Sequence, residues 1–475
     1  MTENGTPIRA RRRAPAARIT ALLTAIALAG TGLPAATTPA RAQSAGKMPI
    51  IRDTEMEQLL RDYAKPILKA AGLTQQKVKV VVLNDRSFNA FVMDGHHIFI
   101  NAGALFEAKT PNEVIGVLAH ETGHLAGGHL SRLREKLAQA QTQSIIAMLL
   151  GAGALIAGAR AGSGGGNIGA AAILGPQSAI QHSLLAYVRT QEDQADHAGV
   201  KFLNATHQSP KGMVDLFKRL ASENLYRTQY ADPYLQTHPM PADRVAALET
   251  LAKASPYWNV KDPPALQERH DLVRAKLSGF LERPDTVRRR YPPSNHSLPA
   301  RYARAISTYL HGDLRQAVAQ IDDLIHSQPG NPYFYELKGQ ALLEGGHPGE
   351  AIPALQRAVA LSHHAPLIDV LLAQAFIASN NKKYAGEAID LLLSAQRQDK
   401  DVPGAYAQLA MAYGQKGDLA HADLASAQAA MQRGDVPTAH QLAERAKRRL
   451  AVGSPAWVRA DDIVNVKLPK SLFHP

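Results

Sequence analysis

The alternation of hydrophobic and polar positions predicts a small sheet early in the chain. Residues 77–83 alternate and are rich in β-branched side chains, a pattern typical of a strand. Residues 89–93 and 96–100 form two more apolar runs, separated by Asp94-Gly95. An Asp-Gly pair between two such runs favours a β-hairpin. We therefore expect a small antiparallel sheet here.

A helix is predicted directly after this sheet. The stretch 112–119 has its apolar residues on one stripe of a helix. Thr110 is a suitable N-cap, and Pro111 is favoured in the first turn. This helix continues into the residues that carry the most specific chemistry of the chain.

The C-terminal part of the chain repeats with a period of 34 residues, measured from Gly312 to Gly346. Each unit has two helical stretches and a turn, and the period is that of tetratricopeptide (TPR) repeats. We predict a TPR domain over residues 300–452 and a tail over 453–475. Such units stack into a superhelix with a binding surface, whereas the alternative is a plain helical bundle.

Two segments of the chain have unusual composition. Residues 144–181 are hydrophobic and Gly-rich, and their first apolar run is shorter than a membrane span requires. They are interpreted as a flap that covers a functional site, as a membrane or client contact, or as a true span. Residues 261–299 are Pro-rich around one helical stretch and are read as a linker. The domain before this linker is expected to span 43–260 and contains the helix predicted above.

The first 42 residues have the composition of a signal peptide, with clustered arginines, an apolar run and the cleavage signature Ala40-Arg41-Ala42. A retained anchor is the alternative. The whole chain carries a formal net charge of +12, and removing this segment leaves about +7. No nucleic-acid module is recognisable. The chain has no cysteine, so disulfides and lipidation at cysteine are excluded.

The predicted helix ends in the sequence His120-Glu121-Thr122-Gly123-His124. Residues four apart share a helix face, so both imidazoles can point at one metal ion. Glu121 then projects beside the metal, where it can act as a general base toward water. The motif therefore predicts a zinc peptidase. The alternative is a surface helix with two solvated histidines.

A catalytic zinc ion needs a third protein ligand. Glu192 is the preferred candidate, because Asp196 follows it by one helical turn and can serve as a hydrogen-bond partner behind a ligand. His129 is the other candidate, but if the helix continues it lies about 140° away from His124 and is a plain surface residue. Of two adjacent strand histidines, His96 and His97, at most one could reach a metal.

These motifs, followed by Thr237-His238-Pro239 and Arg244, resemble those of the BepA/YfgC-type periplasmic zinc metallopeptidases. These peptidases are relatives of HtpX and the CAAX-prenyl endopeptidases. The motifs occur in the family's order, and the resemblance covers essentially all of the mature chain, including the C-terminal repeats. Gln194 is one departure, because the family often has Glu at this position. The resemblance implies an α+β gluzincin-type domain, mostly helical with a small antiparallel sheet, followed by an all-α TPR solenoid.

The same resemblance implies roles for individual residues. His120, His124 and Glu192 would bind one Zn²⁺ ion, and Glu121 would be the catalytic base. His238 would reach the zinc as a switch or as a catalytic group, whereas its context alone suggests a turn residue. Arg244 would lie at the rim as a partner for a substrate carbonyl.

Two functions follow from this resemblance. The first is a periplasmic zinc endopeptidase that cleaves misfolded or stalled envelope proteins and docks through its repeats, in quality control of outer-membrane protein assembly. The second is mainly a TPR-based chaperone or adaptor with a latent, self-inhibited protease site. The expected partners are unfolded or misassembled outer-membrane proteins and their assembly machinery, with a membrane-surface contact through 144–181.

Overall fold

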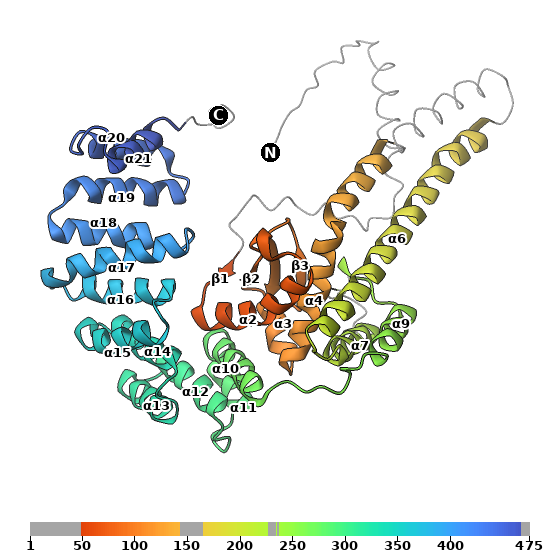
Figure 1. The fold of residues 1–475 in the computed structure, drawn as a ribbon, viewed down its shortest axis with the longest axis horizontal. Helices are drawn as coiled ribbons and strands as arrows, with labels where there is room; N and C mark the ends of the chain where they lie inside the picture. The colour runs from red at the N-terminus through yellow and green to blue at the C-terminus, as the bar shows by residue number, and fades with distance from the viewer. Residues whose placement is uncertain (1–48, 143–164, 227–233, 235–236, 467–475) are drawn as a thin grey trace, which may run out of the picture. The chain divides into compact units, whose positions relative to one another are not determined.

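The computed structural model describes residues 49–142, 165–226, 234 and 237–466. It contains a sheet-bearing domain followed by a stack of helices (Figure 1). The predicted signal segment and most of the hydrophobic segment 144–181 lie outside the described residues. The elements of the first part are β1 (Ile50–Ile51), α2 (Thr54–Ala70), η1 (Thr74–Gln76), β2 (Lys79–Leu83), β3 (Ala90–Val92), β4 (His97–Asn101), α3 (Ala102–Glu107), α4 (Pro111–Gly127), α6 (Gly165–Ala205), α7 (Lys211–Tyr226), α9 (Ala242–Lys253), α10 (Pro264–Leu281) and α11 (Pro284–Arg290).

The sheet has four strands in the order β1-β2-β4-β3. The predicted hairpin is confirmed, because β3 and β4 pair antiparallel with Phe91 opposite Phe99. The expectation of a wholly antiparallel sheet was wrong for one ladder, because β2 pairs with β4 in parallel. The hairpin places β3 on the far side of β4, so β3 forms an edge of the sheet.

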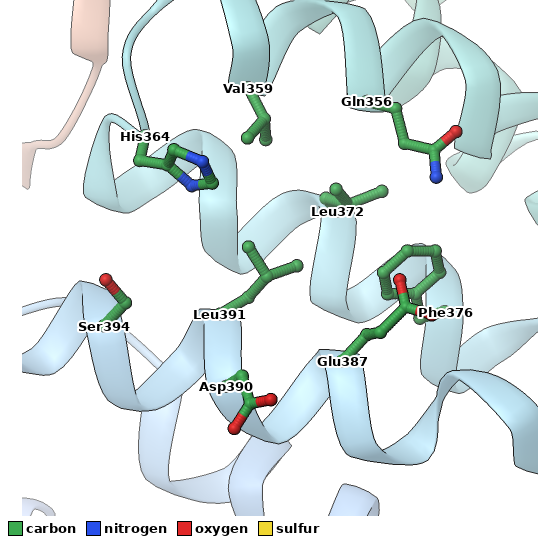
Figure 2. Close-up of a pocket in the computed structure, with 9 residues that line it drawn as sticks. All are labelled: Gln356, Val359, His364, Leu372, Phe376, Glu387, Asp390, Leu391 and Ser394. Atoms are coloured by element: carbon green, nitrogen blue, oxygen red, sulfur yellow. The ribbon is translucent and has the colours of Figure 1, made fainter.

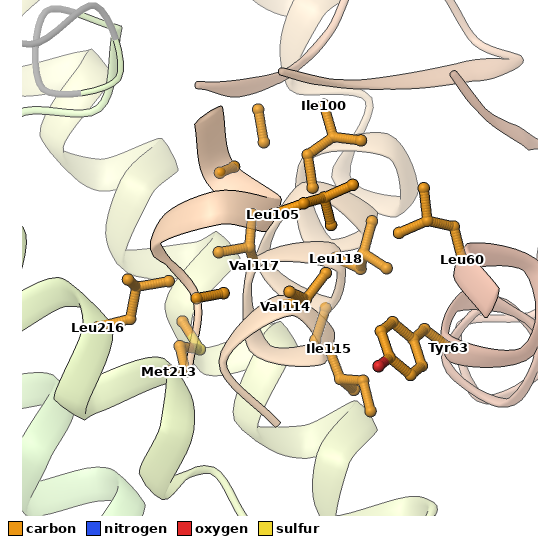
Figure 3. Close-up of a cluster of buried hydrophobic side chains, with 14 of the residues drawn as sticks. Leu60, Tyr63, Ile100, Leu105, Val114, Ile115, Val117, Leu118, Met213 and Leu216 are labelled. Carbon is orange, nitrogen blue, oxygen red and sulfur yellow. The ribbon is translucent and has the colours of Figure 1, made fainter. Parts of the chain in front are cut away.

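Helix α4 is the central helix of this domain, and its predicted start is confirmed. The Thr110 side chain accepts a hydrogen bond from the Glu113 backbone N–H, and Pro111 stands in the first turn. Every residue from Pro111 to Gly123 is buried. A helix that is buried on all sides needs apolar partners around it. Figure 3 shows these partners around Val114, Ile115, Val117 and Leu118: Leu60 and Tyr63 from α2, Ile100 from β4, Leu105 from α3, and Met213 and Leu216 from α7.

Two glycines of α4 allow its neighbours to approach closely. A Cβ atom at Gly116 would lie 2.6 Å from the Met213 Cβ of α7. A Cβ atom at Gly123 would lie 2.9 Å from the Ala195 carbonyl oxygen of α6. Both positions therefore exclude any side chain. Because Gly123 lies between His120 and His124, α6 crosses α4 beside these two histidines. Within the described residues, no helix combines the length and the apolar character needed to cross a bilayer.

The C-terminal part is a series of helix pairs, as the 34-residue period predicts. Four helices of these pairs have an Asp or Asn residue as N-cap. These N-cap residues are Asp313, Asn331, Asp418 and Asp435. The predicted C-terminal tail includes one more helix, α21, whose buried face packs on the preceding pair. The helices are α12 (Leu298–His311), α13 (Leu314–Ser327), α14 (Pro332–Glu344), α15 (Pro348–Leu361), α16 (Pro366–Ala378), η2 (Lys382–Tyr384), α17 (Ala385–Gln398), α18 (Ala405–Lys416), α19 (Leu419–Gln432), α20 (Val436–Lys447) and α21 (Pro455–Val464).

Helix α10, in the predicted linker, belongs to the packed structure on both sides. Val273 and Leu277 lie in the core of the catalytic domain, whereas Leu272 lies in the core of the first helical repeats. Lys276 of the same helix is buried, with its Nζ 2.6 Å from Asp53 and 3.3 Å from Glu55. The segment 264–281 is thus a shared element of two cores.

A pocket of about 370 Å³ opens between α15, α16 and α17 (Figure 2). Its floor is apolar and includes Val359, Leu372 and Phe376, all of them buried. Glu387 and Asp390 stand exposed at its rim on α17. The pocket therefore combines an apolar floor with an acidic edge.

Candidate metal centre

The two histidines of the HExxH motif face each other at the C-terminal end of α4. The Nε2 atoms of His120 and His124 are 3.1 Å apart, and the His120 side chain is fully buried. The His120 ring packs edge-on against Phe217 of α7, which fixes its plane. The helix thus presents two nitrogen atoms to one point, as predicted from their spacing.

Glu192 comes from α6 and reaches the same point. Its carboxylate oxygens lie 3.5 Å from His120 Nε2 and 3.4 Å from His124 Nε2. The close crossing of α4 and α6 at Gly123 is what brings this side chain within reach. The sequence motif Glu192–Asp196 thus lies where a third ligand is needed.

His238 brings a fourth donor atom into this group. Its Nδ1 atom lies 3.4 Å from His120 Nε2 and 3.0 Å from Glu192 Oε2. The donor atoms of His120, His124, Glu192 and His238 all lie within 4.8 Å of one another. Zinc–nitrogen and zinc–oxygen bonds of about 2.0–2.1 Å in a tetrahedron place the ligand atoms about 3.3 Å apart. The spacing of these donors therefore fits a tetrahedral zinc ion.

The charges around the site also fit a cation. Burial alone would lower the pKa of His120, but its interactions with Asp196 and Glu192 outweigh burial and raise the pKa to about 9. A raised pKa means that the surroundings stabilise positive charge at this position. A metal ion supplies that charge and leaves the imidazole neutral, as a ligand must be.

Glu121 lies beside the donor group without joining it. Its side chain is 1% exposed, and neither carboxylate oxygen has a hydrogen-bond partner among the described residues. The His238 Nε2 atom is 3.5 Å from Glu121 Oε1. Burial raises the pKa of Glu121, against the lowering effect of His238. A carboxylate with free lone pairs and a raised pKa is suited to accept a proton.

Asp196 and Arg244 form a layer behind the donor group. Asp196 Oδ1 lies 2.9 Å from His120 Nδ1, the ring nitrogen that faces away from the donors. Arg244 donates from Nε and Nη2 to Asp196, and its Nη1 lies 2.9 Å from Glu192 Oε2. Asp196 thus lies behind a donor, and its role as a hydrogen-bond partner of a ligand stays a prediction. The guanidinium of Arg244 is directed at two carboxylates, so this geometry gives it a positioning role, and the predicted contact with substrate stays a prediction.

Of the other candidate histidines, His129 lies where the sequence reasoning did not expect it, whereas His96 and His97 lie at the sheet as expected. His129 is 4% exposed and its ring lies against His124, so the expectation of a surface residue was wrong. The reason is that α4 ends at Gly127 instead of continuing. His96 and His97 are directed to Gln76 and Asp94 at the sheet, away from the donor group.

Tyr234 is a residue of the site that sequence reasoning missed. It is fully buried, its ring centroid lies 4.6 Å from that of His238, and it also packs on Phe88 of the core. Burial raises the pKa of its hydroxyl well above the usual range. Tyr234 lies three residues before Thr237 and outside every motif identified in the sequence, so no spacing pointed to it.

Comparison with known proteins agrees with this geometry. The model of Peptidase family M48 matches residues 51–252, and that of the tetratricopeptide repeat matches residues 302–366 and 338–403. The first match contains all donor residues named above. The domain that holds the site is thus similar to M48 peptidases over residues 51–252, and the protein is a metalloendopeptidase with TPR repeats.

Several curated proteins are similar in sequence to this chain. The chain is 22% identical to the beta-barrel assembly-enhancing protease of Yersinia pestis over 434 residues, which is 88% of this chain and 85% of that protein. It is 23% identical to the Escherichia coli protein of the same name over 368 residues, 76% of this chain and 72% of the relative. The mitochondrial metalloendopeptidase OMA1 of Schizosaccharomyces pombe is 27% identical over 192 residues, 39% of this chain and 50% of that protein.

The geometry predicts which side chains hold the metal. His124→Ala and Glu192→Ala each remove one donor, so zinc affinity should fall at least about 100-fold. Glu121→Gln should bind zinc like the wild type, because Glu121 is adjacent to the donors without being one. Zinc content and competition with a chelator measure both outcomes. Undiminished zinc affinity in Glu192→Ala would show that the third ligand lies elsewhere. Glu350→Ala, which removes an exposed carboxylate, is the matched control for a nonspecific loss of zinc.

Proposed function

We propose that this protein is a periplasmic zinc endopeptidase that cleaves misfolded or stalled envelope proteins during outer-membrane protein assembly. The observation that carries the proposal is the donor group of His120, His124 and Glu192 with Glu121 beside it. The names of the relatives from Yersinia pestis and Escherichia coli support the connection with β-barrel assembly. The composition of residues 1–42 supports export to the periplasm.

The chemistry assigns one task to each group. A bound zinc ion would polarise the scissile carbonyl and lower the pKa of the attacking water. Glu121 would take the proton from that water, and it could then return the proton to the leaving amine. Asp196 and Arg244 would hold the donors in place through the ion pairs and hydrogen bonds described above.

The sheet offers a way to hold an unfolded substrate. β3 is an edge strand, and it packs beside α4 in the catalytic domain. An extended polypeptide can add to such an edge through backbone hydrogen bonds, which select conformation more than sequence. This mode of binding suits a protease whose substrates are unfolded polypeptides of different sequence.

The alternative function is a TPR-based chaperone or adaptor whose protease site is latent. The buried position of His238 among the donors favours self-inhibition, which both functions can include. The two differ in whether Glu121 matters, because an adaptor has no use for a general base. Cleavage measurements with a Glu121 variant therefore separate them.

The proposed function predicts that Glu121→Gln abolishes cleavage of a misfolded outer-membrane β-barrel protein and retains zinc. Loss of a general base costs roughly 10²–10⁴-fold in rate. Cleavage is followed by gel electrophoresis under conditions in which zinc content is measured in parallel. If wild-type protein with bound zinc leaves the substrate intact but keeps it soluble, the chaperone function replaces the protease.

His238 is proposed to regulate the site by occupying the fourth zinc position. Its Nδ1 lies among the donor atoms, where water must bind for the reaction. A neutral imidazole competes well with water for such a position. His238 lies between α7 and α9 and belongs to neither helix, so we infer that its side chain can leave the donor atoms while both helices stay packed.

The switch predicts that His238→Ala increases cleavage, including self-cleavage, at near-normal zinc content. If the resting site is open about a tenth of the time, the increase should approach tenfold. Initial rates and zinc stoichiometry are measured together, with His326→Ala as a matched change of an exposed histidine. A large fall in rate at unchanged zinc would assign His238 to catalysis instead.

The pocket between α15, α16 and α17 is proposed to dock the client polypeptide. Its apolar floor would accept a large aliphatic or aromatic side chain, and Glu387 and Asp390 at the rim favour a neighbouring Lys or Arg (Figure 2). The TPR match over residues 338–403 includes this pocket and supports a role in protein binding.

Charge reversal at the rim should weaken docking and leave the protease site intact. The double variant Glu387→Lys/Asp390→Lys should lose about tenfold in affinity for basic-aromatic peptides drawn from an outer-membrane β-barrel sequence, since each rim charge changes sign. Fluorescence anisotropy measures this, and cleavage of a short unstructured peptide should remain unchanged. Glu350→Lys, on α15 outside the pocket, is the matched control. Equal affinities for all three proteins would place docking elsewhere.

A further inference from the structure

The HExxH helix ends in a way that brings a further histidine, His129, to the site. α4 stops at Gly127, and Gly128 adopts a left-handed conformation with φ 61°. The Gly128 N–H bonds to carbonyls of the last turn, which closes the helix. Residues 129–142 then begin a new helical stretch. The change of direction at Gly128 is what carries His129 back over the end of α4.

The His129 ring lies directly against a metal donor. Its Nδ1 atom is 3.0 Å from His124 Nδ1, and the two rings are nearly perpendicular with centroids 5.0 Å apart. A Cβ atom at position 127 would lie 2.2 Å from His129 Nε2, so the ring occupies the space that Gly127 leaves free. The contact therefore depends on both glycines.

The proton positions in this pair follow from the geometry of the donors. His124 Nε2 faces His120 and Glu192, so it must be unprotonated to bind a metal. The proton of a neutral His124 then resides on Nδ1, which can donate it to the Nδ1 lone pair of His129. This hydrogen bond fixes both the tautomer and the plane of the His124 ring.

His129 is itself held by α6, the helix that supplies Glu192. The Gln191 side chain donates from Nε2 to the His129 backbone carbonyl at 3.2 Å. The Gln194 side chain of the same helix also interacts with the His129 side chain. The ring is thus clamped between the end of α4 and the helix of the third donor.

We propose that His129 is a positioning residue for His124, as Asp196 is for His120. The proposal rests on the zinc site proposed above. In this arrangement the anionic Asp196 orients His120, and the neutral acceptor His129 orients His124. Both rings are oriented, and only one carboxylate lies behind them. Removing such a partner lowers metal affinity by about 10–100-fold, because the ligand loses its fixed orientation and tautomer.

The experiment compares zinc affinities by chelator competition in the full-length protein. His129→Phe fills the site without an acceptor and should lose about 10–100-fold in affinity. His129→Asn places an amide oxygen near the Nδ1 position and should restore most of that loss. Gly127→Ala pushes the ring away from His124 and should resemble His129→Phe. The double variant Gly127→Ala/His129→Phe should show no further loss, because both changes break one contact.

Matched measurements keep the outcomes distinct. His326→Ala removes an exposed histidine and should bind zinc like the wild type. Thermal unfolding of the metal-free variants shows whether the fold is retained. The positioning role would be overturned if His129→Phe and Gly127→Ala bound zinc with affinities within about twofold of the wild type. Such a change is well below the loss expected on removing a positioning partner. A loss as large as that of His124→Ala would make His129 a ligand, and failure of the wild type to bind zinc would overturn the proposed zinc site itself.

Discussion

The structure depends on the burial of α4 from Pro111 to Gly123. His120 and Glu121 lie within this buried stretch, and buried polar groups need polar partners because water cannot reach them. The apolar neighbours from α2, α3, β4 and α7 fix the rotation of this helix about its axis and its position along that axis. The glycines at 116 and 123 then let α7 and α6 approach without side chains between them. The position of Glu192 is a consequence of that packing.

Burial also determines the electrostatics of the site. Glu121, Glu192 and Asp196 lie together in the interior, and Arg244 is the cation that pairs with two of them. Buried charge of one sign is costly unless a counter-charge accompanies it. The raised pKa of His120 shows how strongly the pocket attracts positive charge. A divalent ion meets this demand, so the same packing that buries the carboxylates creates affinity for a metal.

The sequence predicted the parts of the site that lie on regular helices. Helical spacing placed His120 with His124 and Glu192 with Asp196, the HExxH motif and the family resemblance singled out Glu192, and the 34-residue period predicted the repeats. The parallel pairing of β2 with β4 was missed, because alternation marks a strand without naming its neighbour. His129 was misjudged for a similar reason: angular spacing applies only while a helix continues, and Gly127-Gly128 ends it. Glycine pairs near a motif were the signal that could have revealed this contact.

Helix α10 shows why the repeats are more than an appended module. It contributes Val273 and Leu277 to one core and Leu272 to the other, so neither core is complete without it. Lys276 joins the N-terminus of α2 to Glu336 of α14 in a buried cluster, and the Tyr302 hydroxyl donates to Glu55 in the same place. Breaking a buried ion cluster costs more than breaking a surface pair, so movement at this joint is restricted. Since α2 packs directly on α4, a polypeptide bound to the repeats acts on a structure that is continuous with the helix of the metal donors.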